Sequence, residues 1–160
     1  MQIDESVMKM ATFFAAALSM GIGAIGSAYG LGYASSKACE AIARQPQESG
    51  KIIKMMLIGQ AASGTPSIFS LLISFLLLFG PAPKQGLVQV FAILGAGICM
   101  GAGAVGPGIG AGFANAEACD GVARMPDSET TLLRVMLMGQ AVSQSTSIYA
   151  LVIAFLLTIV

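Results

Sequence analysis

Long apolar segments separated by short polar breaks dominate the chain. Four such segments cover roughly residues 9–41, 52–80, 87–120 and 131–160. Each is longer than the ~20 residues that an α-helix needs to cross ~30 Å of hydrocarbon, so each predicts a transmembrane helix. Their surplus length predicts helices that tilt or that project beyond the hydrocarbon.

The breaks between these segments are residues 44–50, 80–86 and 124–128, and each contains proline. Proline ends helices because it lacks an N–H and clashes with the preceding turn. The pattern therefore predicts an all-α membrane protein with four transmembrane helices, arranged as two tandem helical hairpins.

The second half of the chain repeats the first with an offset of 80 residues. Such a repeat indicates two copies of one structural unit. We therefore divide the chain into a first hairpin, 1–80, and a second hairpin, 81–160, joined at Pro81-Ala82-Pro83. The matching pairs are Gly26 and Gly106, Gly30 and Gly110, Gly32 and Gly112, Cys39 and Cys119, Arg44 and Arg124, Pro46 and Pro126, and Gly59-Gln60-Ala61 and Gly139-Gln140-Ala141.

Composition supports a membrane location and removes several classes of function. The 160 residues are 56% hydrophobic and only 10% charged, whereas a soluble domain carries roughly 25% charged residues. A net charge of zero argues against a nucleic-acid partner. Histidine is absent and the three cysteines lack metal-binding spacing, so we expect no metal centre and no cofactor. The acidic N-terminus and the length of the first apolar segment argue against a cleavable signal.

Basic residues gather beside the two hairpin loops. The positive-inside rule therefore predicts a multi-pass protein of the cell membrane with both loops in the cytoplasm and both termini outside. The residues beside the loops are Lys37, Arg44, Lys51, Lys54, Arg124 and Arg134, and those on the other side are Lys9 and Lys84.

The first helix of each hairpin is rich in glycine. A GxGxxG run here does not indicate a dinucleotide site, because that motif needs a preceding strand in a βαβ unit. Glycine instead lets helix backbones approach closely, so we expect these helices to lie inside a ring and the bulkier second helices to face lipid. Pro107 predicts a kink in the third helix. The expected packing glycines are Gly26, Gly30, Gly32, Gly106, Gly108, Gly110 and Gly112.

A polar cluster lies in the middle of the last apolar segment, at residues 143–147 and Tyr149. Hydrocarbon offers no hydrogen-bond partners, so such groups must find them inside the protein. The cluster indicates a former or present site, or else a tight helix contact with hydroxyls bonded back to their own helix.

These motifs carry a family resemblance. A glycine-rich helix, then Ala43-Arg44-Gln45-Pro46, then Gly59-Gln60-Ala61 resembles the rotor-ring c subunit, or proteolipid, of F-type ATP synthases. The second hairpin resembles it more closely, through Gly106-Pro107-Gly108, Ala123-Arg124-Met125-Pro126 and Gly139-Gln140-Ala141-Val142. The fused form with four spans resembles V-type and some bacterial proteolipids.

The resemblance implies a ring of hairpins in which an Asp or Glu midway along the outer helix carries H⁺ or Na⁺. This sequence departs from the family at that residue, because Gln144 and Gly64 occupy the two carboxylate positions. Leu31 and Ala111 occupy the position of the inner-helix glutamine of sodium-type members. The resemblance assigns the surviving shell of the site to the Val142 carbonyl, Ser145, Thr146 and Tyr149, with Ala111 beside it.

Three explanations of the missing carboxylates stay open. The chain is a silent protomer mixed with carboxylate-bearing c subunits, or Gln144 is an engineered replacement of a natural glutamate, or the first hairpin uses polar groups such as Ser63 and Thr65. Hydroxyls alone bind a proton or Na⁺ poorly, which disfavours the third. A glutamine side chain does not exchange a proton near neutral pH, so Gln144 predicts a locked site.

The resemblance implies a non-catalytic rotor-ring subunit of an ion-translocating ATP synthase or ATPase. Its partners would be other c subunits, the stator a subunit, the central stalk and membrane lipids, and H⁺ or Na⁺ would be the coupling ion. A structural proteolipid ring or scaffold is the alternative, and a membrane enzyme is a distant third. The loop residues expected to face the stalk are Arg44, Gln45, Pro46, Arg124, Met125 and Pro126.

Overall fold

The computed structural model describes residues 5–80 and 86–159, and all of its regular elements there are helical. The first hairpin consists of α1 (Glu5–Arg44), the short 3₁₀ helix η1 (Pro46–Glu48), α2 (Ser49–Ser63) and α3 (Thr65–Phe79). The second consists of α4 (Leu87–Arg124), η2 (Pro126–Ser128) and α5 (Glu129–Ile159). The Pro81-Ala82-Pro83 joint, and with it the boundary between the hairpins, lies outside the described residues.

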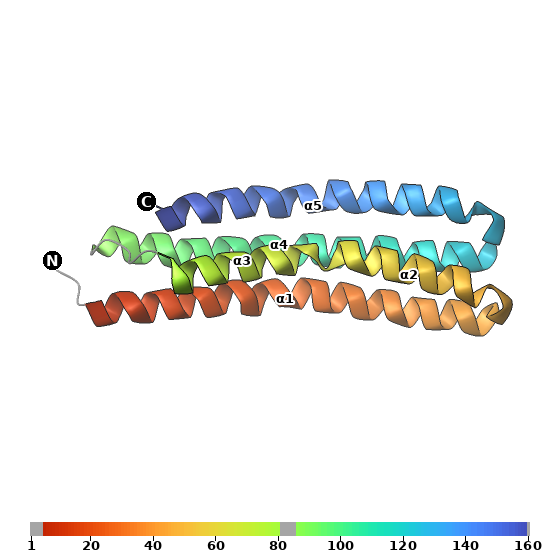
Figure 1. Ribbon diagram of the computed structural model, residues 1–160, viewed down its shortest axis with the longest axis horizontal. Helices are drawn as coiled ribbons and strands as arrows, with labels where there is room; N and C mark the ends of the chain where they lie inside the picture. Colours follow the sequence, from red (N-terminus) through yellow and green to blue (C-terminus); the bar gives the residue numbers. More distant parts are fainter. Residues whose placement is uncertain (1–4, 81–85, 160) are drawn as a thin grey trace.

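Four helical segments are long and apolar enough to cross a membrane, which confirms the predicted all-α membrane fold. They run side by side, with the described ends Glu5 and Ile159 at one end and both 3₁₀ helices at the other (Figure 1). The antiparallel arrangement follows from the short connections η1 and η2, because proline in each turns the chain after one helix and opens the next.

The two glycine-rich helices α1 and α4 form the most extensive helix pair, and α2, α3 and α5 pack against them. The second span of the first hairpin lies across both, since α2 packs more on α4 and α3 packs more on α1. Apolar side chains fill the contacts at both ends of the bundle. One cluster includes Ile73, Ile93 and Met100, and the other includes Ile52, Met55, Val122 and Met136.

Prolines act differently in the two hairpins. Pro107 lies buried inside α4 without ending it, so the kink expected there leaves one continuous helix. The second span of the first hairpin, expected as a single helix over 52–80, is divided at Gly64. Pro66 lies just beyond this break, and its missing N–H and its ring clash explain why the α-helical ladder stops there.

Ion pairs join the hairpins at the loop end. The Arg44 guanidinium lies 2.5 Å from one carboxylate oxygen of Asp120, and the Arg124 guanidinium lies 2.6 Å from the other. Lys54 pairs with Glu129 at 2.9 Å, also across the two hairpins. Arg44 and Arg124 are largely exposed, so these pairs fix the register of the loops more than they add to stability.

Candidate ion-site region between the hairpins

Gln144 lies at the contact between the two hairpins. Its Nε2 donates a hydrogen bond to the backbone carbonyl of Ala62, at 2.8 Å. Both residues are half-buried, and Ala62 precedes the break between α2 and α3. By the 80-residue repeat, Ala62 corresponds to Val142. The side chain at one expected carboxylate position therefore reaches a carbonyl of the preceding hairpin, two residues before the other expected position.

Gln140, one turn earlier on α5, is the most heavily bonded side chain of this region. It is 1% exposed, and its Nε2 lies 2.9 Å from the Ala111 carbonyl, 3.2 Å from the Gly59 carbonyl and 3.3 Å from the Ser63 hydroxyl. It thus joins α5 to both α4 and α2. Its Oε1 has no hydrogen-bond partner among the described residues.

Gln60, the repeat partner of Gln140, makes only the bonds that stay inside its own hairpin. Its Nε2 lies 3.4 Å from the Leu31 carbonyl and 2.7 Å from the Ser35 hydroxyl. Leu31 corresponds to Ala111, so each glutamine donates to the same carbonyl of its own inner helix. Within the described residues, Gln140 contacts the preceding hairpin and Gln60 does not.

The shell expected around Gln144 is not gathered there within a single chain. Val142 and Tyr149 are 74% and 65% exposed. The Ser145 hydroxyl donates to the Val142 carbonyl at 2.8 Å, and the Thr146 hydroxyl donates to the Ser143 carbonyl at 3.2 Å. The carbonyl of buried Ala111 accepts from Gln140 instead. Val142, Ser145, Thr146 and Tyr149 thus lie along one edge of α5, apart from the Gln144 contact, whereas Ala111 is buried in α4.

Gly64, at the other expected carboxylate position, has an ordinary helical backbone with φ of −78°. A Cβ placed there would have one neighbour within 4 Å, the Gln60 carbonyl oxygen at 3.6 Å. Neither the backbone nor the packing of this chain requires glycine at position 64.

Sequence reasoning missed the acceptor side of the Gln144 contact. Ala62 carries no polar side chain, so nothing in its identity points to a site. The available signal was Pro66, because a proline in an apolar helix leaves the carbonyl four residues earlier without its usual N–H. Gln140 was used only as part of a motif, although a buried glutamine in a membrane helix itself indicates a polar contact.

The expected packing glycines divide into two groups. A Cβ at Gly26 would overlap the Val105 backbone, and a Cβ at Gly30 would overlap Gly108. The same holds in reverse for Gly108 and Gly112, which lie against α1. Gly110 faces the Ser143 hydroxyl, whereas Gly32 and Gly106 have nothing within 4 Å in the described chain.

The loop residues occupy the turn at one end of the bundle. Arg44 and Arg124 end α1 and α4, and Pro46 and Pro126 open the two 3₁₀ helices. Gln45 and Met125 are exposed between them. Apart from the ion pairs with Asp120, these residues present their side chains to the surroundings rather than to the bundle.

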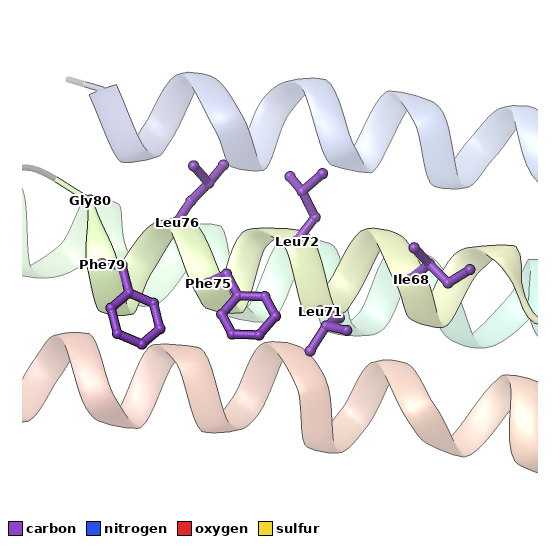
Figure 2. A pocket seen from close by; sticks show the side chains of 7 residues that line it. All are labelled: Ile68, Leu71, Leu72, Phe75, Leu76, Phe79 and Gly80. Carbon is purple, nitrogen blue, oxygen red and sulfur yellow. The ribbon is translucent and has the colours of Figure 1, made fainter.

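A hollow on the described surface is apolar, unlike the polar region around Gln144. It has a volume of about 590 Å³ and is lined by α3 and the glycine that follows it. In Figure 2, Leu72 and Leu76 project toward α5, and Phe75 and Phe79 project toward α1. The lining offers almost no polar groups, so it suits hydrocarbon contact and not an ion or a nucleotide. It is formed by Ile68, Leu71, Leu72, Phe75, Leu76, Phe79 and Gly80.

Comparison with known proteins decides the family. The profile that describes the ATP synthase C subunit matches the chain twice, over residues 14–77 and 94–157. The chain belongs to the ATP synthase C-subunit family. The two matches confirm the expected tandem duplication of a c-subunit hairpin.

Relatives of this chain each match about half of it. The ATP synthase c subunit of Thermotoga petrophila is 49% identical over 76 residues, which are 48% of this chain and 89% of that protein. The protein of the same name from Natranaerobius thermophilus is 49% identical over 73 residues, 46% of this chain and 84% of that protein. That from Petrotoga mobilis is 45% identical over 75 residues, 47% and 78% of the two chains.

Proposed function

We propose that this chain is a non-catalytic rotor-ring subunit of an ion-translocating ATP synthase or ATPase, and that it is a silent protomer in a mixed ring. The observation that carries the proposal is the Gln144 amide, which donates to Ala62 at a position where the family bears a carboxylate. An amide has no titratable proton near neutral pH, so this position neither loads nor releases H⁺. Companion c subunits with a membrane Asp or Glu would carry the coupling ion, H⁺ or Na⁺.

The inner helices support assembly by repetition of the contact inside the chain. On α4, the residues that pack on α1 include Gly101, Val105 and Gly112. Their repeat partners on α1 are Gly21, Ile25 and Gly32, and all three are exposed. A Cβ added at either glycine would have no neighbour within 4 Å in the described chain. Ala17 and Ala28 extend this stripe, and correspond to Gly97 and Gly108 on α4.

The reverse also holds. On α1, Leu18, Ile22 and Gly26 lie against α4. Their repeat partners on α4, Ile98, Ala102 and Gly106, are exposed. Each chain therefore presents one half of its internal interface on α1 and the other half on α4. Such head-to-tail surfaces join copies into a ring when the rotation closes.

Charges at the loop end fit the same arrangement. Arg44 of the first hairpin pairs with Asp120 of the second, and the repeat partners of these residues are Arg124 and Glu40. Both are exposed, and Arg124 lies on the side where a following hairpin would place its Glu40. The contact inside the chain thus supplies a template for a charge pair between neighbours.

The α5 edge is suited to complete the ion site of a neighbour. Gln144 reaches Ala62 of the preceding hairpin, so the repeat offers the Val142 carbonyl to position 64 of a following hairpin. Ser145 and exposed Tyr149 lie on the same stretch of α5. A carboxylate-bearing neighbour would meet these groups there, whereas another copy of this chain would bring Gly64 and no carboxylate.

The remaining partners follow from the family and the charge distribution. We propose that the loops bearing Arg44-Gln45-Pro46 and Arg124-Met125-Pro126 lie in the cytoplasm and contact the central stalk. The stator a subunit and membrane lipids would contact the outer helices. The apolar hollow on α3 supports lipid contact.

A structural proteolipid ring outside any ATPase is the second candidate. It is favoured by the absence of Asp and Glu from the middle of the described apolar helices. Glu117 and Asp120 lie near the loop end of α4 instead. The retained arginine-proline loops disfavour it, since they have no evident use without a stalk. The third explanation, with hydroxyls as the site, is disfavoured by the Ser63 hydroxyl, which lies 2.8 Å from the Gly59 carbonyl and 3.3 Å from Gln140.

The deciding experiment is the intact mass of the native ring, with every constituent chain sequenced by mass spectrometry. We expect this chain together with single-hairpin c subunits that carry a membrane carboxylate, and co-purification with stalk and stator subunits. A ring made only of this chain, with Gln144 confirmed in the genome-encoded sequence, would reject ion transport through it and support the scaffold. A native glutamate at position 144 would instead identify Gln144 as a substitution.

The assembly surface makes a separate prediction. Gly32→Ala should leave the isolated chain folded, because an added Cβ has no neighbour within 4 Å in the described chain. It should nevertheless prevent or weaken ring assembly, since the partner position Gly112 lies directly against Gly30. Native mass spectrometry and gel filtration would measure the ring fraction, with Gly50→Ala as the control. Normal rings from Gly32→Ala chains would contradict the head-to-tail arrangement.

A further inference from the structure

We propose that Pro66 and Gln144 are a matched pair that closes the joint between the two hairpins. Proline leaves the Ala62 carbonyl without its usual helical donor, and the glutamine amide of the other hairpin takes that donor's place. This inference deepens the proposed function and rests on it, because it gives position 144 a structural task that a carboxyl group performs only while protonated.

The break between α2 and α3 shows how the carbonyl becomes available. In a continuous helix the Ala62 carbonyl would accept from the N–H of residue 66, but Pro66 has none. Around the break the Gly64 N–H lies 3.1 Å from the Gln60 carbonyl oxygen and is also directed at the Ala62 carbonyl oxygen. The Ser67 N–H turns to the Gly64 carbonyl at 3.2 Å. Among the described residues, the Gln144 amide is the side chain that donates to the Ala62 carbonyl.

The burial of Ala62 and Pro66 increases the stabilisation expected from the Gln144 hydrogen bond. Pro66 is among the fully buried side chains, and Ala62 is half-buried beside it. A carbonyl in such a place within a membrane has little access to water, and leaving it unpaired is costly. The Gln144 amide pairs it at 2.8 Å, a normal length for a good N–H···O bond.

The second hairpin lacks this arrangement. Thr146 stands at the position of Pro66, and α5 runs unbroken from Glu129 to Ile159. The Val142 carbonyl there accepts the Ser145 hydroxyl at 2.8 Å. The proline and the glutamine therefore lie on opposite sides of the same joint. The proline leaves a carbonyl without its helical donor, and the glutamine supplies a donor to it.

The chemistry of the pair predicts a hydrogen bond at the joint that does not depend on pH. A glutamine amide donates whatever the pH, whereas a carboxyl group donates only when it is protonated. An ionised glutamate at position 144 would place negative oxygen against the Ala62 carbonyl oxygen and remove its side-chain donor. With Pro66 in place, a glutamate at position 144 would therefore release its proton less readily than with a residue that restores the N–H.

A double-mutant cycle on the full-length protein tests the pairing. We expect Gln144→Leu to lower the thermal midpoint by about 2 to 4 °C, the shift that one lost hydrogen bond produces in a protein of this size. In the Pro66→Thr background, which restores the N–H, the same change should cost half of that or less. Equal losses in both backgrounds would overturn the proposal. Pro66→Ala restores the same N–H and replaces Pro66→Thr if that variant does not fold.

Gln60→Leu is the matched control for this cycle. Gln60 is also an interhelical amide donor, but it bonds Leu31 and Ser35 inside the first hairpin. Its loss should be the same with and without Pro66→Thr. If Gln60 shows the same coupling as Gln144, the effect belongs to the helix break in general, and the specific pairing is wrong.

A pH profile supplies a readout that general destabilisation does not move. In Gln144→Glu, labelling by a hydrophobic carbodiimide, followed by intact mass, reports the protonated carboxyl. We expect Pro66→Thr to lower the midpoint of this profile by about one pH unit, a tenfold loss of proton affinity. An unchanged midpoint would overturn the proposal. The ring composition tests the proposed function separately, so failure of one does not imply failure of the other.

Discussion

Gly112→Ala is expected to prevent normal packing of the two hairpins. A Cβ at position 112 would overlap Gly30 Cα and lie 2.5 Å from the Gly30 carbonyl carbon and oxygen. These are backbone atoms of a packed helix and cannot rotate away, so α1 and α4 must separate. Overpacking of this kind costs typically 1–3 kcal/mol, and we expect a loss of about 3 kcal/mol or more.

The loss should appear as a fall of the thermal midpoint by roughly 6 to 12 °C in the purified chain, from about 2 to 4 °C per kcal/mol at this size. Gly32→Ala is the control, because Gly32 is the repeat partner of Gly112 and has open space around it. The same substitution at equivalent positions should thus destabilise the folded chain in one case and affect only its assembly in the other. Equal midpoints for the two variants would show that α1 and α4 do not pack through these glycines.

Gly64→Glu is expected to create a reactive membrane carboxyl in a chain whose described apolar helices have none in their middle. The backbone at Gly64 is helical and an added Cβ meets only one atom, at 3.6 Å, so neither the backbone nor the first side-chain atom is strained there. Burial in an apolar region raises the pKa of a carboxyl group, and its protonated form reacts with a hydrophobic carbodiimide. We expect one adduct per variant chain and none in the unmodified chain, measured by intact mass.

Gly64→Gln is the matched control, because it has the same size and lacks the carboxyl. Within an assembled ring, protection of the new carboxyl by Na⁺ would identify sodium as the coupling ion, and protection by high pH alone would identify H⁺. If Gly64→Glu chains assemble and stay unlabelled while companion subunits react, position 64 does not face an ion pathway, and the proposed role of the α5 edge is wrong.

The sequence by itself determined the fold class and the family. Long apolar segments with proline-containing breaks admit little besides four transmembrane helices, since backbone groups in hydrocarbon must bond within their own segment. The offset of 80 residues fixed the tandem organisation, and the glycine-rich and Gly-Gln-Ala motifs pointed to the family that comparison confirmed. The resemblance to the family also placed Gly64 and Gln144 at the expected carboxylate positions, and that assignment stays a prediction.

Only the tertiary structure decided which groups these positions meet. The glycines look alike in the sequence, yet Gly112 lies against Gly30 whereas Gly32 is open, because a single chain contains just one of the two contacts that its repeat allows. The Gln144 side chain was expected to share a site with Val142 and Ser145, but its amide donates to the Ala62 carbonyl. Its acceptor is a backbone carbonyl freed by a proline on another helix. Side-chain identity does not record such a carbonyl, because every residue has one and packing alone determines which is reached.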